Sequence, residues 1–140
     1  MFSGRWSISV ENRRLVEDTI DLIVKYCNDV AVMRHRVKDR KGFDDDIMAQ
    51  YGLSMAVSQI GECVRRIDIW LENHSEYDWS RCIGMRNLIT HRYQRIDYDL
   101  VWKSINDDVP DVLKIVLRLK DIIPDCPDED FLNIRTNALD

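Results

Sequence analysis

Hydrophobic residues recur at steps of three and four along the first part of the chain, which is the spacing of one face of an α-helix. The pattern predicts a single long amphipathic helix from about Glu11 to Arg40. Its stripe contains Leu15, Thr19, Leu22, Ile23, Tyr26, Val30, Met33 and Val37. The C-terminal end of this segment is basic, which suits the negative pole of a helix dipole. Those cations form either a solvated helix end or a phosphate contact.

A second apolar stripe is longer and more regular. It contains Met48, Tyr51, Gly52, Met55, Ala56, Gln59, Ile60, Cys63, Val64, Ile67, Trp70 and Leu71. The stripe covers about seven turns on one helical face, which is typical of a helix in a bundle. We therefore expect Met48 and Met55 to fill the core, and Gln59 to need a hydrogen-bond partner if it is buried. Gly61 would allow another helix to approach closely.

Two shorter helices complete the pattern. Asp78 or Ser80 can cap the first of them, which should break over residues 93–97. The second begins near Asp97, and Pro110 should kink or restart it because proline lacks an amide donor.

Residues 1–127 are thus predicted to form one domain, an all-α antiparallel bundle of four to five helices. Pro124 and Pro127 end the last helix, and the polar tail over residues 128–140 is expected to be loose. Glycine (5) and proline (3) are scarce, which leaves little turn chemistry for a many-stranded sheet.

Composition and charge narrow the function classes. With 45% hydrophobic residues, 32% charged residues and a formal net charge of -5, the chain is typical of a globular protein and argues against nonspecific coating of nucleic acid. No signal peptide is recognisable, and no apolar run approaches the ~20 residues that span a bilayer. We therefore expect a cytoplasmic protein with no membrane partner.

Neither the cysteines nor the histidines predict a metal site. The four cysteines form no C-x-x-C pair, and most of them lie in apolar helical patterns, as expected of buried thiols. The three histidines are without clustered carboxylates or thiols in the sequence, and His74 is expected to be a surface residue. The acidic run over residues 44–46 is interpreted as a solvated helix start. No metal and no cofactor are predicted.

The chemistry of the chain is concentrated between Trp79 and Ile96, where four arginines occur without an acidic residue. Within this segment Arg86, His91 and Tyr93 follow the spacing R-x4-H-x-Y. On a straight helix, positions five apart diverge by roughly 140°, so the arginine and the histidine cannot converge. Either the helix ends near residue 90 and swings the histidine into a turn, or a second subunit completes the site.

These residue types suit RNA cleavage without a metal. An imidazole can take a proton from a ribose 2′-hydroxyl, and a guanidinium can stabilise charge on the phosphate oxygens. Internal attack would then give a 2′,3′-cyclic phosphate end, a reaction closed to DNA. The pattern is equally compatible with a structural interpretation, in which Arg86 is an ion-pairing helix residue and His91 caps a helix C-terminus.

The flanking residues resemble the HEPN domain of the HepT-like toxins. The resemblance is carried by Ile83-Gly84-Met85-Arg86-Asn87, His91-x-Tyr93 and Ile96-Asp97-x-x-x-Val101-Trp102. Upstream, Ile60-Gly61-Glu62 is similar to an Ile-Gly-Glu segment of the family; downstream, Asn106-Asp107-Asp108-Val109-Pro110 is similar to its Asn-Asp-Leu-Pro turn. The resemblance spans roughly residues 15–119.

This resemblance implies a homodimer that sets its R-x4-H motifs in a cleft between protomers. It also implies a metal-independent endoribonuclease, the toxin of a type VII-like toxin–antitoxin pair, with tRNA or mRNA as its substrate. Arg86 and His91 would be catalytic, and Asn87 would support the site. Tyr93 matches a tyrosine that the antitoxin, a minimal nucleotidyltransferase, modifies with AMP from ATP. The added bulk and negative charge would block the RNA cleft.

One departure from the family concerns the position after the histidine, which is usually glycine and is Arg92 here. If that position needs a positive φ, arginine is strained there; if not, it adds a phosphate contact. Arg81, Arg95, Arg36 and Lys38 are further candidates for RNA binding. The alternative function is a non-catalytic helical module that binds a nucleotidyltransferase partner.

Overall fold

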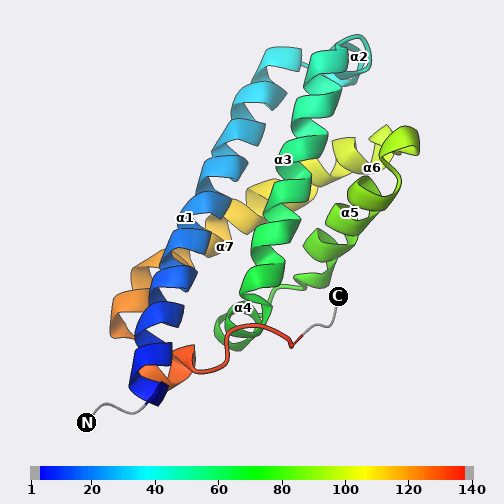
Figure 1. Ribbon diagram of the computed structural model, residues 1–140. Coiled ribbons are helices and arrows are strands. Elements are labelled where there is room, and N and C mark those ends of the chain that lie inside the picture. Colours follow the sequence, from blue (N-terminus) through cyan, green and yellow to red (C-terminus); the bar gives the residue numbers. More distant parts are fainter. Residues whose placement is uncertain (1–3, 138–140) are drawn as a thin grey trace.

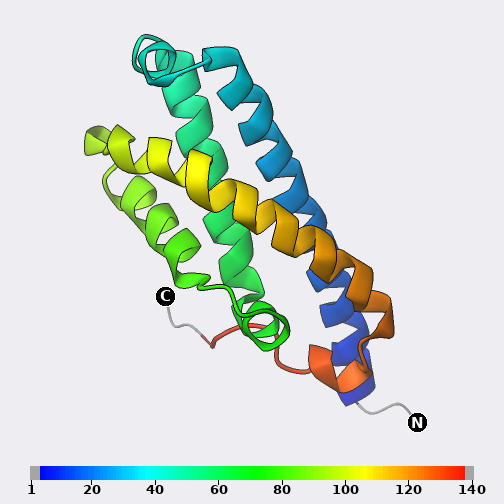
Figure 2. The same cartoon turned by 180° about the vertical axis from the view of Figure 1, so that it is seen from behind.

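The computed structural model describes the backbone of residues 4–137 and the side chains of residues 7–92 and 94–137 (Figure 1). Every regular element in this part of the chain is helical, so the prediction of an all-helical fold is confirmed. Three helices lie side by side and alternate in direction, namely α1 (Gly4–Val37), α3 (Ile47–Arg66) and α5 (Ser80–His91). Seen from behind, α6 (Tyr98–Lys103), η2 (Ser104–Asp108) and α7 (Val109–Ile122) cross this layer as one continuous helical rod (Figure 2).

Helix α1 begins earlier than predicted and ends at Val37 rather than Arg40. It stops there because Lys38 has a positive φ of 71°, a left-handed conformation that no α-helix continues. The carbonyl oxygen of Lys38 accepts a hydrogen bond from Nη1 of Arg34 at 3.0 Å, which helps to hold this end. The short helix α2 (Arg40–Asp44) then leads into α3.

Helix α3 starts as predicted from an acidic residue, since the Asp46 side chain accepts from the amide of Ala49. The expectation that Met48 and Met55 fill the core is wrong, because they are 81% and 60% exposed. The later part of the predicted stripe does face inward, but at 100° per residue Met48 and Met55 lie roughly 120° to 140° from the centre of the buried face. That buried stripe contains Ala49, Leu53, Ala56, Val57, Ile60, Cys63 and Val64.

The predicted long second helix is also divided near its end. The backbone leaves helical geometry at Ile67, where φ is -137°, and α4 (Asp68–His74) continues in its own right. Trp70 and Leu71 on α4 are fully buried, so the apolar pattern was read correctly although the helix is interrupted. No helix in residues 4–137 is both long and apolar enough to cross a membrane.

Pro110 was predicted to kink or restart the last helix, and in the structure the helix changes type just before it. The rod passes through a π-helical segment at Ser104–Asp108 before α7 begins with Pro110 in its first turn. Wider turns of this kind arise where the normal hydrogen-bond ladder is interrupted. The Asn106 side chain compensates, because its Nδ2 donates to the Trp102 carbonyl at 2.7 Å.

The segment from Asp128 was expected to be loose, and for residues 128–137 this is wrong. Phe131 is fully buried, and its carbonyl accepts a 2.7 Å hydrogen bond from Nδ2 of Asn12 on α1. Further along, the Asp68 carboxylate accepts from the amide of Thr136 at 2.7 Å and from its hydroxyl at 2.6 Å. Polar composition misled the prediction, since two apolar side chains, Phe131 and Ile134, are enough to dock the segment.

Candidate functional site

The close packing of α3 against α5 positions the candidate arginine. A Cβ atom at Gly61 would collide with the Cβ of Arg86 and the carbonyl oxygen of Cys82, so only glycine permits this approach. The expected role of Gly61 is therefore confirmed. Because the backbone of α3 at Gly61 packs directly against Arg86 on α5, the Cβ atom of Arg86 is fixed relative to α3.

Beyond that contact, the Arg86 guanidinium is held by two neighbours. Its Nε lies 2.9 Å from Oε2 of Glu62 on α3, with the two side chains 20% and 32% exposed. Its Nη1 donates to Oδ1 of Asn87 at 2.9 Å. Within the described side chains Nη2 has no partner, so one edge of the guanidinium is available to a ligand.

His91 is the last residue of α5 and is exposed. Its imidazole makes no hydrogen bond with any backbone or side-chain group that the structure describes, so it does not cap the helix. Because α5 runs unbroken through both residues, Arg86 and His91 point about 140° apart around one axis. Helix α5 does end close to residue 90, and Tyr93 enters a turn, but His91 itself stays on the helix and is not swung toward Arg86.

The position after the histidine shows no strain. Arg92 has φ -130° and ψ 32°, so its φ is negative and any L-residue can adopt it. The strained alternative is therefore excluded, and the exposed arginine places a cation next to His91 in the chain. Tyr93 opens a short 3-10 turn, η1 (Tyr93–Arg95), but its side chain lies outside the described residues.

The five candidate RNA-binding cations fall into three groups. Arg92 and Arg95 are exposed and border a cavity of about 110 Å³ between α5 and α6. Arg36 and Lys38 are exposed at the end of α1, at the upper end of the bundle in Figure 1. Arg81 lies elsewhere and is engaged, because its Nη2 is 3.0 Å from Oδ1 of the half-buried Asp108.

Two features of the structure, one beside Arg86 and one at the other end of the bundle, were not recognised from the sequence. Glu62 was noted only as part of a family segment, although an acidic residue one position after a helix-packing glycine was the available signal. His74 was expected on the surface, but its side chain is 14% exposed and stacks on Trp70 at 4.3 Å between ring centroids. The structure also brings Asp130 and Cys126 to this histidine, which no local spacing indicated.

Comparison with known protein families covers the part of the chain that contains α3 and α5. The model of a family described as ribonuclease HepT-like matches residues 16–119. The chain belongs to the HepT-like ribonuclease family. The matched part runs from α1 to α7 and includes the packed α3–α5 pair with Arg86 and His91.

Several relatives of this HepT-like protein carry ribonuclease names. It is 34% identical over 95 residues to the "Putative RNase" of Methanocaldococcus jannaschii, an alignment that covers 67% of this chain and 86% of that protein. It is 24% identical over 96 residues to the "Probable ribonuclease HepT" of Thermococcus cleftensis, covering 68% and 80% respectively. No solved structure matches the HepT-like chain significantly.

Proposed function

We propose that this HepT-like protein is an endoribonuclease that cleaves RNA without a catalytic metal, using Arg86 and His91. The observation that carries the proposal is the exposed imidazole of His91, which makes no hydrogen bond with any described side chain. The same helix carries Arg86, whose Nη2 has no partner among the described side chains. The family membership supports ribonuclease activity in general, and the residue chemistry supplies a specific mechanism.

In this mechanism neutral His91 takes the proton from a ribose 2′-hydroxyl. The 2′-oxygen attacks the adjacent phosphorus while the bond from phosphorus to the 5′-oxygen of the next nucleotide breaks. The leaving 5′-oxygen takes a proton from the imidazolium form of His91, and the products are a 2′,3′-cyclic phosphate and a 5′-hydroxyl. The Arg86 guanidinium stabilises the charge that builds on the phosphate oxygens.

A second protomer would bring the two groups together. Because Arg86 and His91 diverge around α5, a C2 pair would set the Arg86 of one protomer beside the partner's His91. Four exposed apolar side chains on α3 support such a pairing. They are Ile47, Met48, Tyr51 and Met55.

This apolar surface is continuous with the arginine site. Gln59 donates from Nε2 to Sδ of Met55 at 3.8 Å, and Glu62, the partner of Arg86, follows about one turn later on the same helix face. Burying the methionines against a second copy would therefore carry the Glu62–Arg86 pair to the edge of the interface, where a shared RNA cleft would open.

The RNA would follow cations near His91. Arg92 and Arg95 follow the histidine within four residues, and Arg36 and Lys38 would offer further phosphate contacts at the end of α1. Arg81 is the weakest of the five candidates, because Asp108 already neutralises it. Neutralising phosphates with such side chains makes RNA binding salt-dependent.

We further propose that the protein is a toxin whose antitoxin is a minimal nucleotidyltransferase that adds AMP to Tyr93. The tyrosine oxygen would attack the α-phosphorus of ATP, its proton would pass to a base, and pyrophosphate would leave. The product carries one negative phosphodiester charge on a residue within two positions of Arg92 and Arg95, which would weaken the attraction of these cations for RNA. Mass spectrometry after incubation with such an enzyme and ATP tests this, and an unmodified Tyr93 peptide would count against it.

The nuclease proposal is tested with purified protein, tRNA and mRNA in the presence of EDTA. We expect cleavage that leaves 2′,3′-cyclic phosphate ends and that stops when the 2′-hydroxyls are methylated. Cleavage that persists on 2′-O-methyl RNA would contradict the mechanism. Circular dichroism in the same buffer separates loss of activity from loss of fold.

One observation favours the alternative function, a non-catalytic module that binds a nucleotidyltransferase. Arg86 already has an ion pair and a hydrogen bond, which is what a structural arginine would show. That alternative predicts stable binding of the partner without any RNA cleavage by the unmodified protein.

A further inference from the structure

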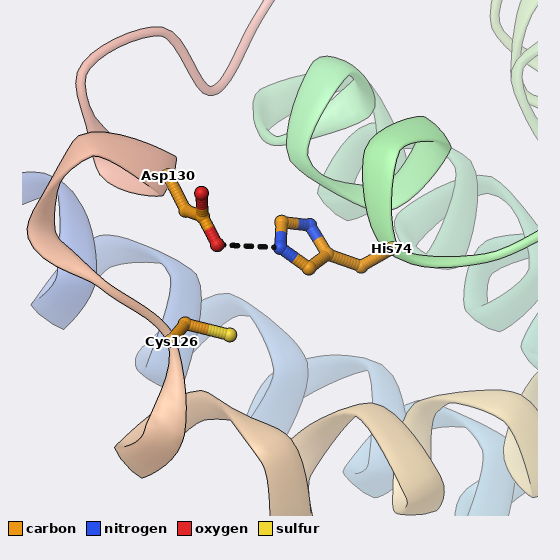
Figure 3. Close-up of side chains that lie close together, drawn as sticks. All are labelled: His74, Cys126 and Asp130. Carbon is orange, nitrogen blue, oxygen red and sulfur yellow. Dashed lines mark hydrogen bonds and ion pairs between the residues drawn. The ribbon is translucent and has the colours of Figure 1, made fainter.

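A second group of reactive side chains meets at the opposite end of the bundle from His91. His74 at the end of α4, Cys126 after η3 (Ile123–Asp125) and Asp130 in η4 (Asp128–Phe131) point into one space (Figure 3). Each offers one ligand atom, and the three atoms lie within 4.8 Å of one another. His74 and Asp130 are 56 residues apart in the sequence, so the fold alone creates this group.

The imidazole of His74 faces oxygen on both sides. Its Nδ1 is 2.8 Å from the carbonyl oxygen of Trp70, and its Nε2 is 3.1 Å from Oδ2 of Asp130. A carbonyl only accepts, so Nδ1 must carry the hydrogen, and Nε2 of the neutral ring then points a lone pair at a carboxylate. The contact is favourable only if a proton or a bound cation lies between the two atoms.

The arrangement of His74 is the one that metal-binding histidines show. Such histidines usually donate their second ring nitrogen to a backbone carbonyl or a carboxylate, which fixes the tautomer and orients the ring. Here the Trp70 carbonyl provides that contact, and stacking of the ring on the Trp70 indole at 4.3 Å restricts its rotation.

The segment that carries Cys126 and Asp130 is held in place by α1. Arg13 donates from Nη1 to the Ile123 carbonyl and from Nη2 to the Cys126 carbonyl, both at 2.8 Å. The Arg13 guanidinium also lies 4.3 Å from the centre of the Phe131 ring. The backbone on both sides of the thiol is thus positioned before any ligand arrives, which lowers the cost of binding.

We propose that His74, Cys126 and Asp130 bind one divalent transition-metal ion of the zinc type, with water as the fourth ligand. Mixed imidazole, thiolate and carboxylate ligands in tetrahedral geometry are characteristic of zinc. Zinc–ligand bonds of about 2.0 to 2.3 Å place tetrahedral ligand atoms roughly 3.3 to 3.8 Å apart. A movement of about 1 Å would therefore bring the three side chains to the distances of a zinc site.

The site is open to solvent and distinct from the proposed nuclease site. His74 borders two surface cavities of about 530 and 520 Å³, which give an ion a route to Nε2. Cys126 and Asp130 both lie beyond residues 16–119, so two of the three ligands come from outside the part matched by the family. The ion would fasten the C-terminal segment to α4, a structural role.

The test uses the full-length protein, stripped with a chelator and titrated with ZnCl2 by calorimetry under a non-thiol reductant. We expect one zinc per chain and a rise in Tm of roughly 10 °C when zinc is at a hundredfold excess over Kd. Cobalt in place of zinc should show a thiolate-to-metal charge-transfer band. Cys126→Ser should abolish the band and weaken zinc binding at least tenfold, and His74→Gln should weaken binding as much.

His35→Gln is the matched control, because His35 is exposed and has no partner among the described side chains. It should bind zinc like the wild type. Absence of stoichiometric binding, or equal binding by wild type, Cys126→Ser and His74→Gln, would overturn the proposal and leave a protonated His74–Asp130 ion pair beside a free thiol.

Discussion

Nε of Arg86 lies 2.9 Å from Oε2 of Glu62, which ties the candidate catalytic helix α5 to α3. The pair has two opposing effects on RNA cleavage. It orients the guanidinium, and it also neutralises charge that would otherwise attract phosphate. Glu62 is therefore a positioning residue in the proposed mechanism, and its influence on substrate binding and on the chemical step should differ in sign.

Glu62→Gln separates these effects, since glutamine keeps the shape and removes the charge. We expect KM for RNA to fall a few-fold because Arg86 attracts phosphate more strongly, and kcat to fall about tenfold because the guanidinium is less well placed. Steady-state kinetics measures both. Glu72→Gln, at an exposed site on α4, is the control. Unchanged kcat and KM in Glu62→Gln would contradict this role.

The approach of α3 and α5 makes a stability prediction with an internal control. Gly61→Ala should lower the free energy of unfolding by about 1 to 3 kcal/mol, since its Cβ would meet Cys82 backbone and Arg86 Cβ. Gly84→Ala on α5 has open space around its Cβ, and should be neutral or stabilising by up to ~1 kcal/mol. Urea denaturation measures both changes. Equal stability of the two variants would refute the packing argument.

The exposed methionines predict an assembly. Met55→Glu should convert a dimer into a monomer and reduce RNA cleavage together with it, because it places a charge in the proposed interface. Leu117→Glu alters a residue that is 45% exposed on α7, the helix that crosses in front of α3 in Figure 2, and should leave the dimer intact. Analytical ultracentrifugation reports the masses. A wild-type protein that sediments only as a ~17 kDa monomer at micromolar concentration would contradict the shared cleft.

The cysteines should differ sharply in reactivity. Burial raises the pKa of Cys27 and of Cys82 to about 12. At pH 8 each of these thiols is therefore ionised in only about one molecule in ten thousand. Cys126 is half-buried, and although burial also raises its pKa, reagents can reach it. Iodoacetamide at pH 8 should therefore label Cys126 first, as peptide mass mapping can show. Rapid labelling of Cys27 or Cys82 in the folded protein would contradict their burial.

Local periodicity was enough to predict the helices and the divergence of Arg86 from His91. It could not tell which part of the broad apolar surface of α3 faces inward, because Met48 and Ala49 are both apolar and only the position of α1 and α5 decides. The grouping of His74 with Asp130 was likewise invisible, since it depends on a segment that returns across the bundle. Residues brought together by such long-range contacts leave no spacing in the sequence.

The most direct test of the central claim compares the RNA cleavage rates of His91→Ala and His35→Ala with that of the wild type, in EDTA and with folding verified. Both histidines are exposed and without a partner among the described side chains, so the two changes are matched in chemistry and cost to the fold. Loss of a general base predicts a rate about 10² to 10⁴ lower for His91→Ala and no change for His35→Ala. Cleavage by His91→Ala at the wild-type rate would show that His91 is not catalytic.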